Sequence, residues 1–483
     1  MLSNRIQHAY GRNPDAVVLV KENVPNPGQE ITLADLKSRI RYVTRLVKPG
    51  SVVATVLDIS IEAIVWLVGV IEAGGSIMPL NPEMAVREFT ESFSFGVDSL
   101  VVSDKEPSRN AMDAATSLSI PVRVAEVMRS SINEEIDYIQ YQKSGGRLIL
   151  FTSGTTSGPK AVPLTESNLL ASVDNILECL CLTSSDSTMC VMPLFHIHGI
   201  VACVLSTLCS GGKLILPNSG KFSARRFLPV MRFYGCSWYT GVPTIHQLVL
   251  GTQGTDEAPL IPALKFIRSS SAKLHVGVLE RMEHAFQVPV IEAYAMTETA
   301  YQITSNPASL AKRRPGTVGI TFGSVAIKIS EFGEVCVKGP NVTSGYLGNQ
   351  VVDAFTSDGY FRTGDLGELD SHGYLIITGR IKEQINRAGE KISPLEIDNI
   401  LKQHSSVNEA VCFGYPDPLY GESIAAAIVS NNANLTKEDL VSFLSDRVVR
   451  FKMPSRWFLV PSLPRTSTGK VQRTTLAKHF GLT

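Results

Sequence analysis

Short apolar runs and longer amphipathic segments alternate along the first part of the chain, as strands and helices do. Residues 52–57 and 76–80 are two apolar runs, and residues 61–73 between them have the length and composition of a buried helix. This alternation predicts right-handed crossover units and a mostly parallel sheet. We expect further strands at residues 99–102, 148–152, 213–217, 237–241, 264–268 and 289–293, with helices at 166–181 and 276–286.

The pattern changes near residue 300. Residues 325–330 and 333–338 are predicted to be short strands joined by a tight turn, and residues 374–378 another strand. We therefore expect a small β-rich, barrel-like subdomain over about residues 300–380.

A third pattern begins near residue 382. Ser393 and Pro394 predict a helix start with proline at its first position, and Thr436 with Asp439 predicts another. Strands are expected near residues 408–413 and 425–429. The predicted fold is α/β. An N-terminal domain over residues 1–381 contains doubly wound α/β subdomains and the small β-barrel-like subdomain, and a mobile α+β C-terminal domain covers residues 382–483.

Composition narrows the function classes. The 483 residues are 44% hydrophobic and 19% charged, as in an ordinary globular protein, and the length allows about two to four domains. Lys plus Arg equals Asp plus Glu at 45 each, which argues against a nucleic-acid partner because such binding depends on phosphate neutralisation. The eight cysteines form no metal-binding pattern, and we expect most of them to be buried thiols.

Targeting signals are not evident. The first residues contain no apolar core of a secretory signal, and the last three do not form a peroxisomal tripeptide. The most apolar run, residues 61–71, contains Glu62 and is too short to span a bilayer. We therefore expect a cytoplasmic enzyme without an integral membrane segment.

A small, hydroxyl-rich loop follows the strand that ends at Thr152. Its sequence is Ser153-Gly154-Thr155-Thr156-Ser157-Gly158-Pro159-Lys160. Backbone N–H groups and hydroxyls in such a loop can surround phosphate oxygens, glycine permits close approach, and Lys160 adds a cation. The spacing is not that of a P-loop. Taken alone, the segment could also be a flexible surface turn.

This loop resembles the signature of the adenylate-forming superfamily, which includes acyl-CoA synthetases, luciferases and the adenylation domains of peptide synthetases. Ser157 stands where the usual loop has glycine, and in this the chain is similar to plant and fungal oxalyl-CoA synthetases. The resemblance implies nucleotide binding by Thr152, Ser153, Gly154, Thr155, Thr156 and Lys160.

Two further motifs resemble the family's acyl pocket. The segment Pro-Leu-Phe-His-Ile-His-Gly over residues 193–199 places His196 on the family's position, which implies a catalytic role facing a carboxylate. For His198, a structural role is the alternative. In the Ser-rich turn after Arg268, Ser271 and Ala272 match family positions that border the adenine and the acyl pocket.

The segment Glu-Ala-Tyr-Ala-Met-Thr-Glu over residues 292–298 resembles the family's adenine and metal motif. The resemblance implies that Tyr294 stacks on adenine beside Glu292 and Ala293, that Thr297 holds an α-phosphate oxygen, and that Glu298 binds Mg²⁺. A hard cation that takes one or two carboxylates plus substrate oxygens fits this arrangement.

The C-terminal motifs follow in the family's order. Asp365, in Thr-Gly-Asp, implies hydrogen bonds to both ribose hydroxyls, for which a carboxylate can accept two bonds. Arg380 implies a contact to ribose or phosphate, Lys382 implies the hinge of the C-terminal domain, and Gly389 implies a pantetheine tunnel. Lys470, in a Pro- and Gly-containing loop, implies the catalytic cation between the carboxylate and the α-phosphate; a solvated surface lysine is the alternative.

The resemblance covers about residues 30 to 475. It implies an ATP-dependent carboxylic acid–CoA ligase that acts through an acyl-adenylate on a small polar acid such as oxalate, with ATP, Mg²⁺ and coenzyme A. Tyr301 stands where the oxalyl-CoA subfamily usually has histidine, so a monocarboxylate or an aromatic acid stays open. Transfer to a carrier protein or an amine is one alternative. A non-catalytic nucleotide-binding regulator is another, against which Glu298, Asp365 and Lys470 argue.

Overall fold

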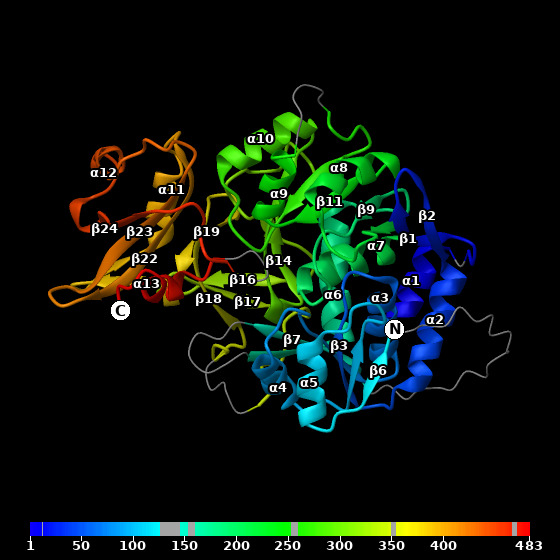
Figure 1. The fold of residues 1–483 in the computed structure, drawn as a ribbon. Helices are drawn as coiled ribbons and strands as arrows, with labels where there is room; N and C mark the ends of the chain where they lie inside the picture. The colour runs from blue at the N-terminus through cyan, green and yellow to red at the C-terminus, as the bar shows by residue number, and fades with distance from the viewer. Residues whose placement is uncertain (12, 126–144, 153–159, 253–258, 349–353, 466–470) are drawn as a thin grey trace. The chain divides into compact units, whose positions relative to one another are not determined.

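The computed structural model describes residues 1–483 except 12, 126–144, 153–159, 253–258, 349–353 and 466–470 (Figure 1). The chain forms two compact units. The first contains Met1–Ala326 and Lys338–Ala354, and the second contains Ile327–Val337 and Phe355–Thr483. The boundary between residues 381 and 382 that the sequence predicts stays a prediction.

A six-stranded sheet lies in the first unit. Strand β3 pairs in parallel with both β4 and β5, and β7 and β8 form an antiparallel hairpin. The expected parallel strand–helix–strand units are therefore present, with α3 between β3 and β4. In spatial order the strands are β6 (Val122–Val124), β5 (Ser99–Val102), β3 (Val52–Val56), β4 (Ser76–Pro79), β7 (Arg147–Thr152) and β8 (Lys160–Thr165).

A nine-stranded sheet lies in the same unit. Its centre is parallel, and antiparallel pairs close both ends, β1 with β2 and β13 with β14 and then β15. In spatial order the strands are β15 (Ile320–Thr321), β14 (Tyr301–Ser305), β13 (Val290–Met296), β12 (Phe266–Ser269), β11 (Trp238–Gly241), β9 (Ser187–Met189), β10 (Lys213–Leu216), β1 (Val17–Asn23) and β2 (Asn26–Thr32).

Helices cover both faces of the six-stranded sheet, as the alternation of side chains along a strand requires. Val53 of β3 packs in the core that contains α3, whereas the next residue, Ala54, packs with α4 and α5. The helices of the first unit are α1 (Leu2–Ala9), α2 (Leu33–Leu46), α3 (Ile61–Glu72), α4 (Val86–Phe93), α5 (Arg109–Ser117), α6 (Glu166–Leu180), the π-helix η1 (His198–Leu205), α7 (Ser206–Ser210), α8 (Ala224–Phe233), α9 (Pro243–Leu250), α10 (Val276–Phe286) and the 3₁₀ turn η2 (Thr297–Thr299).

The second unit contains a four-stranded sheet, with strands in the order β16 (Ala326–Ile329), β17 (Glu334–Lys338), β18 (Phe361–Leu369) and β19 (Leu375–Arg380). The expected β-rich region therefore starts at Ala326 and not near residue 300. Residues 301–305 are fully buried and turn back onto β13 after η2, so they extend the nine-stranded sheet instead.

A five-stranded sheet completes the second unit. β21 (Glu390–Ile392), β20 (Ile385–Arg387), β23 (Gly421–Ser430) and β22 (Val407–Asp417) follow one another, and β24 (Arg456–Leu459) pairs with β23. The other elements are η3 (Ile381–Glu383), α11 (Pro394–Leu401), α12 (Lys437–Ser445), η4 (Arg450–Lys452), η5 (Arg473–Thr475) and α13 (Leu476–His479).

The two predicted helix starts in this unit differ in detail. At α12 the side chains of Thr436 and Asp439 each accept a bond from the other residue's backbone, which confirms the predicted capping box. At α11 the proline takes the first turn as predicted, but the Ser393 hydroxyl does not cap the helix and donates to the Thr378 carbonyl at 2.8 Å.

The cysteines agree with the sequence expectation of mostly buried thiols. All eight cysteines are free thiols, and all except Cys181 are buried. Within the described ranges, no helix is both long and apolar enough to cross a membrane.

Candidate active site

The two ends of the hydroxyl-rich loop are fixed by the β7–β8 hairpin. Thr152 at the end of β7 lies opposite Lys160 at the start of β8. The Lys160 ammonium lies over the Tyr346 ring, 4.6 Å from its centroid. The loop residues Ser153, Gly154, Thr155 and Thr156 lie outside the described residues.

The Thr297–Glu298 turn connects two antiparallel strands at a strained corner. After β13, the 3₁₀ turn brings the chain to Ala300 and Tyr301, whose φ angles are +47° and +102°. A bulky residue rarely adopts positive φ, and such strain collects at functional sites. The amide of Asn341 fixes the corner by donating to the carbonyls of Thr299 and Gln302 at 3.0 and 2.8 Å.

Tyr346 connects the two motifs. Its hydroxyl donates to Oε1 of Glu298 at 2.8 Å, while its ring faces Lys160. Glu298 is 6% exposed, and Thr297 beside it is half-buried. The structure therefore brings the predicted metal carboxylate to the hydroxyl and the predicted phosphate cation to the ring of one tyrosine, which the sequence motifs did not indicate.

Glu292 lies on β13 with Ala293 and Tyr294, and all three side chains are buried. Burial raises the pKa of the Glu292 carboxyl from 4.5 to about 7, although it accepts a bond from the Gly316 N–H at 2.9 Å. The charges of Lys273 and Arg313 oppose the rise without cancelling it.

Four segments of the chain meet at His198, which contacts Ser271, another of the residues predicted to border the acyl pocket. His198, at the start of the π-helix η1, bonds through Nε2 to the Thr240 hydroxyl at 2.7 Å and through Nδ1 to the Ser271 hydroxyl at 3.1 Å. Its ring lies 5.0 Å from that of Tyr301. His196 is half-buried with its ring against Phe195, 4.5 Å between centroids, and Ala272 is exposed. π-Helical turns occur often at functional sites, and this one begins at His198.

Arg268 contacts this cluster through Tyr301. Its guanidinium is 0% exposed and donates to the Tyr301 hydroxyl at 2.9 Å and to Oε1 of Gln302 at 2.6 Å. None of the ion pairs within the described ranges includes Arg268. The sequence signal was a charged residue directly after the apolar pair Phe266 and Ile267, but the motif comparison selected the serines that follow.

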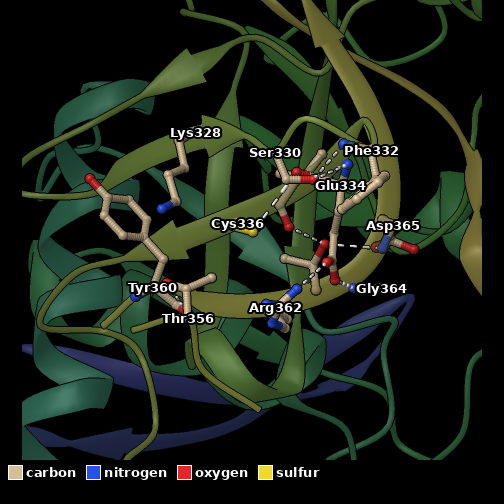
Figure 2. Close-up of polar contacts among 12 residues, drawn as sticks. Lys328, Ser330, Phe332, Glu334, Cys336, Thr356, Tyr360, Arg362, Gly364 and Asp365 are labelled. Atoms are coloured by element: carbon tan, nitrogen blue, oxygen red, sulfur yellow. Dashed lines mark hydrogen bonds and ion pairs between the residues drawn. The ribbon is translucent and has the colours of Figure 1, made fainter. Parts of the chain in front are cut away.

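In the second unit, Asp365 and Arg380 face each other across β18 and β19. They are register partners, and Nε of Arg380 lies 2.7 Å from Oδ1 of Asp365. Asp365 is 3% exposed, whereas Arg380 is exposed. A buried carboxylate beside an exposed guanidinium can bind two hydroxyls and an anionic oxygen. Figure 2 shows the polar contacts around Asp365 and its neighbours Gly364 and Arg362 on β18.

The remaining predicted residues also lie in the second unit. Lys382 is an exposed residue of the 3₁₀ turn η3 directly after β19. Gly389 forms the exposed turn between β20 and β21 with φ +92°, and its N–H donates to the Asn386 side chain at 3.1 Å. Lys470 lies outside the described residues.

Family models match both parts of the chain. The model described as AMP-binding enzyme matches residues 6–347, and the one described as AMP-binding enzyme C-terminal domain matches residues 396–470.

Individual proteins are similar to this chain as well. An oxalate–CoA ligase of Arabidopsis thaliana is 41% identical over 458 residues, which cover 90% of this chain and 89% of that protein. An oxalate–CoA ligase of Saccharomyces cerevisiae is 43% identical over 346 residues, 69% of this chain and 63% of that protein. The crystal structure of ATP-bound MatB from Rhodopseudomonas palustris superposes with a TM-score of 0.87 at 26% identity over 99% of both chains. The chain therefore belongs to the AMP-binding enzyme family, within the adenylate-forming superfamily, and resembles its oxalate–CoA ligases.

Proposed function

We propose that this protein joins oxalate to coenzyme A through an oxalyl-adenylate, at the expense of ATP. It is an AMP-forming acid–CoA ligase. In the first half-reaction a carboxylate oxygen attacks the α-phosphorus and pyrophosphate leaves. In the second, the thiol sulfur of coenzyme A attacks the acyl carbon, AMP leaves and the thiol proton is lost to solvent.

The buried guanidinium of Arg268 is the observation on which the oxalate assignment rests. Arginine stays charged in proteins, and a buried charge is costly unless an opposite charge or several hydrogen bonds compensate it. Its partners Tyr301 and Gln302 are neutral. An acid with a second carboxylate would supply the missing negative charge, because the attraction is strong where water is excluded.

Size points in the same direction. Tyr301 is 0% exposed and fills the space between Arg268 and His198, so polar side chains bonded to one another occupy the end of the expected acyl pocket. A long acyl chain would need an apolar lining there. The Tyr301 phenol, which replaces the histidine usual in the oxalyl-CoA subfamily, faces a cation that comes from β12 instead. The names of the two oxalate–CoA ligases also support oxalate and coenzyme A.

Adenylation must bring two anions together, and their repulsion is a large part of the barrier. Lys160 and, by its family position, Lys470 are the cations that we assign to the phosphates and the reacting carboxylate, and Thr297 donates its hydroxyl to the α-phosphate. Asp365 accepts from both ribose hydroxyls while Arg380 holds it in place. His196 faces the acid.

Magnesium fits the residues that are present. Within the described part of the chain, no three His, Cys, Asp or Glu side chains cluster as metal ligands. Mg²⁺ suits a site with a single carboxylate, because it takes most of its oxygen ligands from substrate phosphates and water. Glu298 is that carboxylate, and the Tyr346 hydroxyl orients it. When bound, Mg²⁺ would neutralise phosphate charge.

The second half-reaction needs a change of domain arrangement in this family. We assign the pivot to Lys382, at the junction of residues 1–381 and 382–483, and a part of the pantetheine tunnel to Gly389. The mixed anhydride must meanwhile be kept from water.

Replacement of Arg268 tests the assignment. Arg268→Met keeps an unbranched side chain but removes the guanidinium and its charge. We therefore expect kcat/KM for oxalate to fall roughly a hundred-fold, which corresponds to about 3 kcal/mol, while that for acetate changes much less. Tyr301→Phe keeps the cation and serves as the matched control, with a smaller loss for oxalate. An equal loss for oxalate and acetate in Arg268→Met would contradict a role in recognising the second carboxylate.

A further inference from the structure

The Thr363–Gly364–Asp365 corner is a bulge in the four-stranded sheet. On β17 Glu334 is the register partner of Leu366 and Cys336 that of Arg362, so the single residue Val335 faces three residues of β18. Such a bulge re-aims side chains and leaves backbone groups outside the regular ladder. Asp365 is the last residue of this bulge, and Gly364 within it adopts φ +73°.

The bulge has bonds of its own to β17. The Thr363 hydroxyl donates to the Val335 carbonyl at 2.7 Å, and it accepts from the Asp365 N–H at 3.1 Å. These two bonds fix the first and last residues of the bulge, and the N–H of the middle residue, Gly364, needs a further acceptor.

Glu334 supplies that acceptor. Its Oε1 accepts from the Gly364 N–H at 3.0 Å, and its Oε2 lies 3.2 Å from Nη1 of Arg362 (Figure 2). The residue is 7% exposed. Its own backbone is held by Ser330, whose hydroxyl accepts from the Glu334 N–H at 3.0 Å and whose N–H donates to the Glu334 carbonyl at 2.8 Å. Ser330 therefore fixes the backbone of Glu334, and the Glu334 carboxylate bonds to Arg362 and Gly364, the two neighbours of Thr363.

We propose that Glu334 is a positioning residue for nucleotide recognition: it fixes the bulge so that Asp365 can bind both ribose hydroxyls. A buried carboxylate that gains a charged and a backbone partner is well compensated, and removal of it leaves the Gly364 N–H without its acceptor. The inference rests on the proposed function, because the ribose role of Asp365 does.

The preference for ATP over 2′-deoxy-ATP tests it, since a general loss of structure would lower activity with both nucleotides alike. We would measure kcat and KM for each in oxalate-dependent pyrophosphate release. Asp365→Ala defines the complete loss of preference. In Glu334→Ala, the ratio of kcat/KM for ATP to that for 2′-deoxy-ATP is expected to fall at least ten-fold, mainly because KM for ATP rises.

Three further variants separate the bond to Gly364 from the ion pair. Glu334→Gln keeps an oxygen for the Gly364 N–H and is expected to restore most of the preference. Glu334→Asp keeps the charge but is one methylene shorter, so it is expected to lose the preference and replaces Glu334→Ala if that variant does not fold by circular dichroism. Arg362→Gln removes only the ion pair and is expected to keep the preference.

The outcomes distinguish the inference from the function on which it rests. Wild-type preference in folded Glu334→Ala or Glu334→Asp, or an equal loss in Arg362→Gln, would overturn the role of Glu334. A wild-type enzyme that releases pyrophosphate equally well from both nucleotides would overturn the ribose role of Asp365 and the inference with it. Absence of acid-dependent pyrophosphate release in the wild type would overturn the proposed function itself.

Discussion

Some side chains of the candidate site can be identified from the sequence, and others depend on contacts that only the fold creates. Thr297, Glu298, Asp365 and Arg380 could be selected because each stands at a fixed place in a motif. Arg268 was not selected, because the role that we assign to it depends on contacts with Tyr301 and Gln302, which belong to another strand. The positive φ of Tyr301 was also unpredictable, since residues other than glycine give no local signal for it.

Glu292 makes stability depend on pH. Its pKa is raised by burial from 4.5 to about 7, so the folded protein binds this proton more tightly than the unfolded chain does. The stabilising contribution is complete below about pH 4.5 and is lost as the pH rises through the folded pKa near 7. Its slope is at most about 1.4 kcal/mol per pH unit.

Urea unfolding of the wild type and of Glu292→Gln from pH 5 to pH 8 measures this contribution. The free energy of unfolding is expected to fall more steeply with pH in the wild type than in the variant, because glutamine has no proton to lose. Parallel curves for the two proteins over this range would show that Glu292 does not titrate there.

At the level of elements, periodicity predicted most helices and parallel strands, and helix α10 has the predicted limits of residues 276 and 286. The start of the β-rich region was misplaced because β14 is a short strand that follows a tight turn. Its partner β13 precedes it along the chain, and hydrophobic pattern alone does not show which sheet a strand joins.

The corner between β13 and β14 depends on Asn341, which is 0% exposed. Asn341→Ala removes the donor to two carbonyls, and we expect a loss of about 1–3 kcal/mol in the free energy of unfolding. Because the corner presents Glu298, the Mg²⁺ concentration for half-maximal pyrophosphate exchange is expected to rise as well. Urea unfolding and a Mg²⁺ titration measure the two effects. A destabilised variant with wild-type Mg²⁺ dependence would restrict Asn341 to folding.

At the scale of the whole molecule, the order of the motifs predicted the family, although contacts far apart in sequence could not be read from it. The family's two-step chemistry predicts that Lys470 acts in only one half-reaction. Lys470→Ala is expected to slow adenylate formation roughly a hundred- to a thousand-fold, because it removes a charge that stabilises the transition state. This loss corresponds to a rise of about 3–4 kcal/mol in the activation free energy.

Thioester formation from supplied oxalyl-AMP and coenzyme A is expected to continue in Lys470→Ala at close to the wild-type rate. Single-turnover assays of the two half-reactions measure both rates. An equal loss in both would argue that Lys470 does not leave the site between them.

The central claim, that the protein activates oxalate for transfer to coenzyme A, is tested most directly by ATP–pyrophosphate exchange with a panel of acids, followed by product analysis with coenzyme A. The account predicts that oxalate has the highest kcat/KM among oxalate, malonate, acetate, benzoate and hexanoate, and that oxalyl-CoA accumulates when the thiol is added. A kcat/KM for hexanoate or benzoate well above that for oxalate would contradict it.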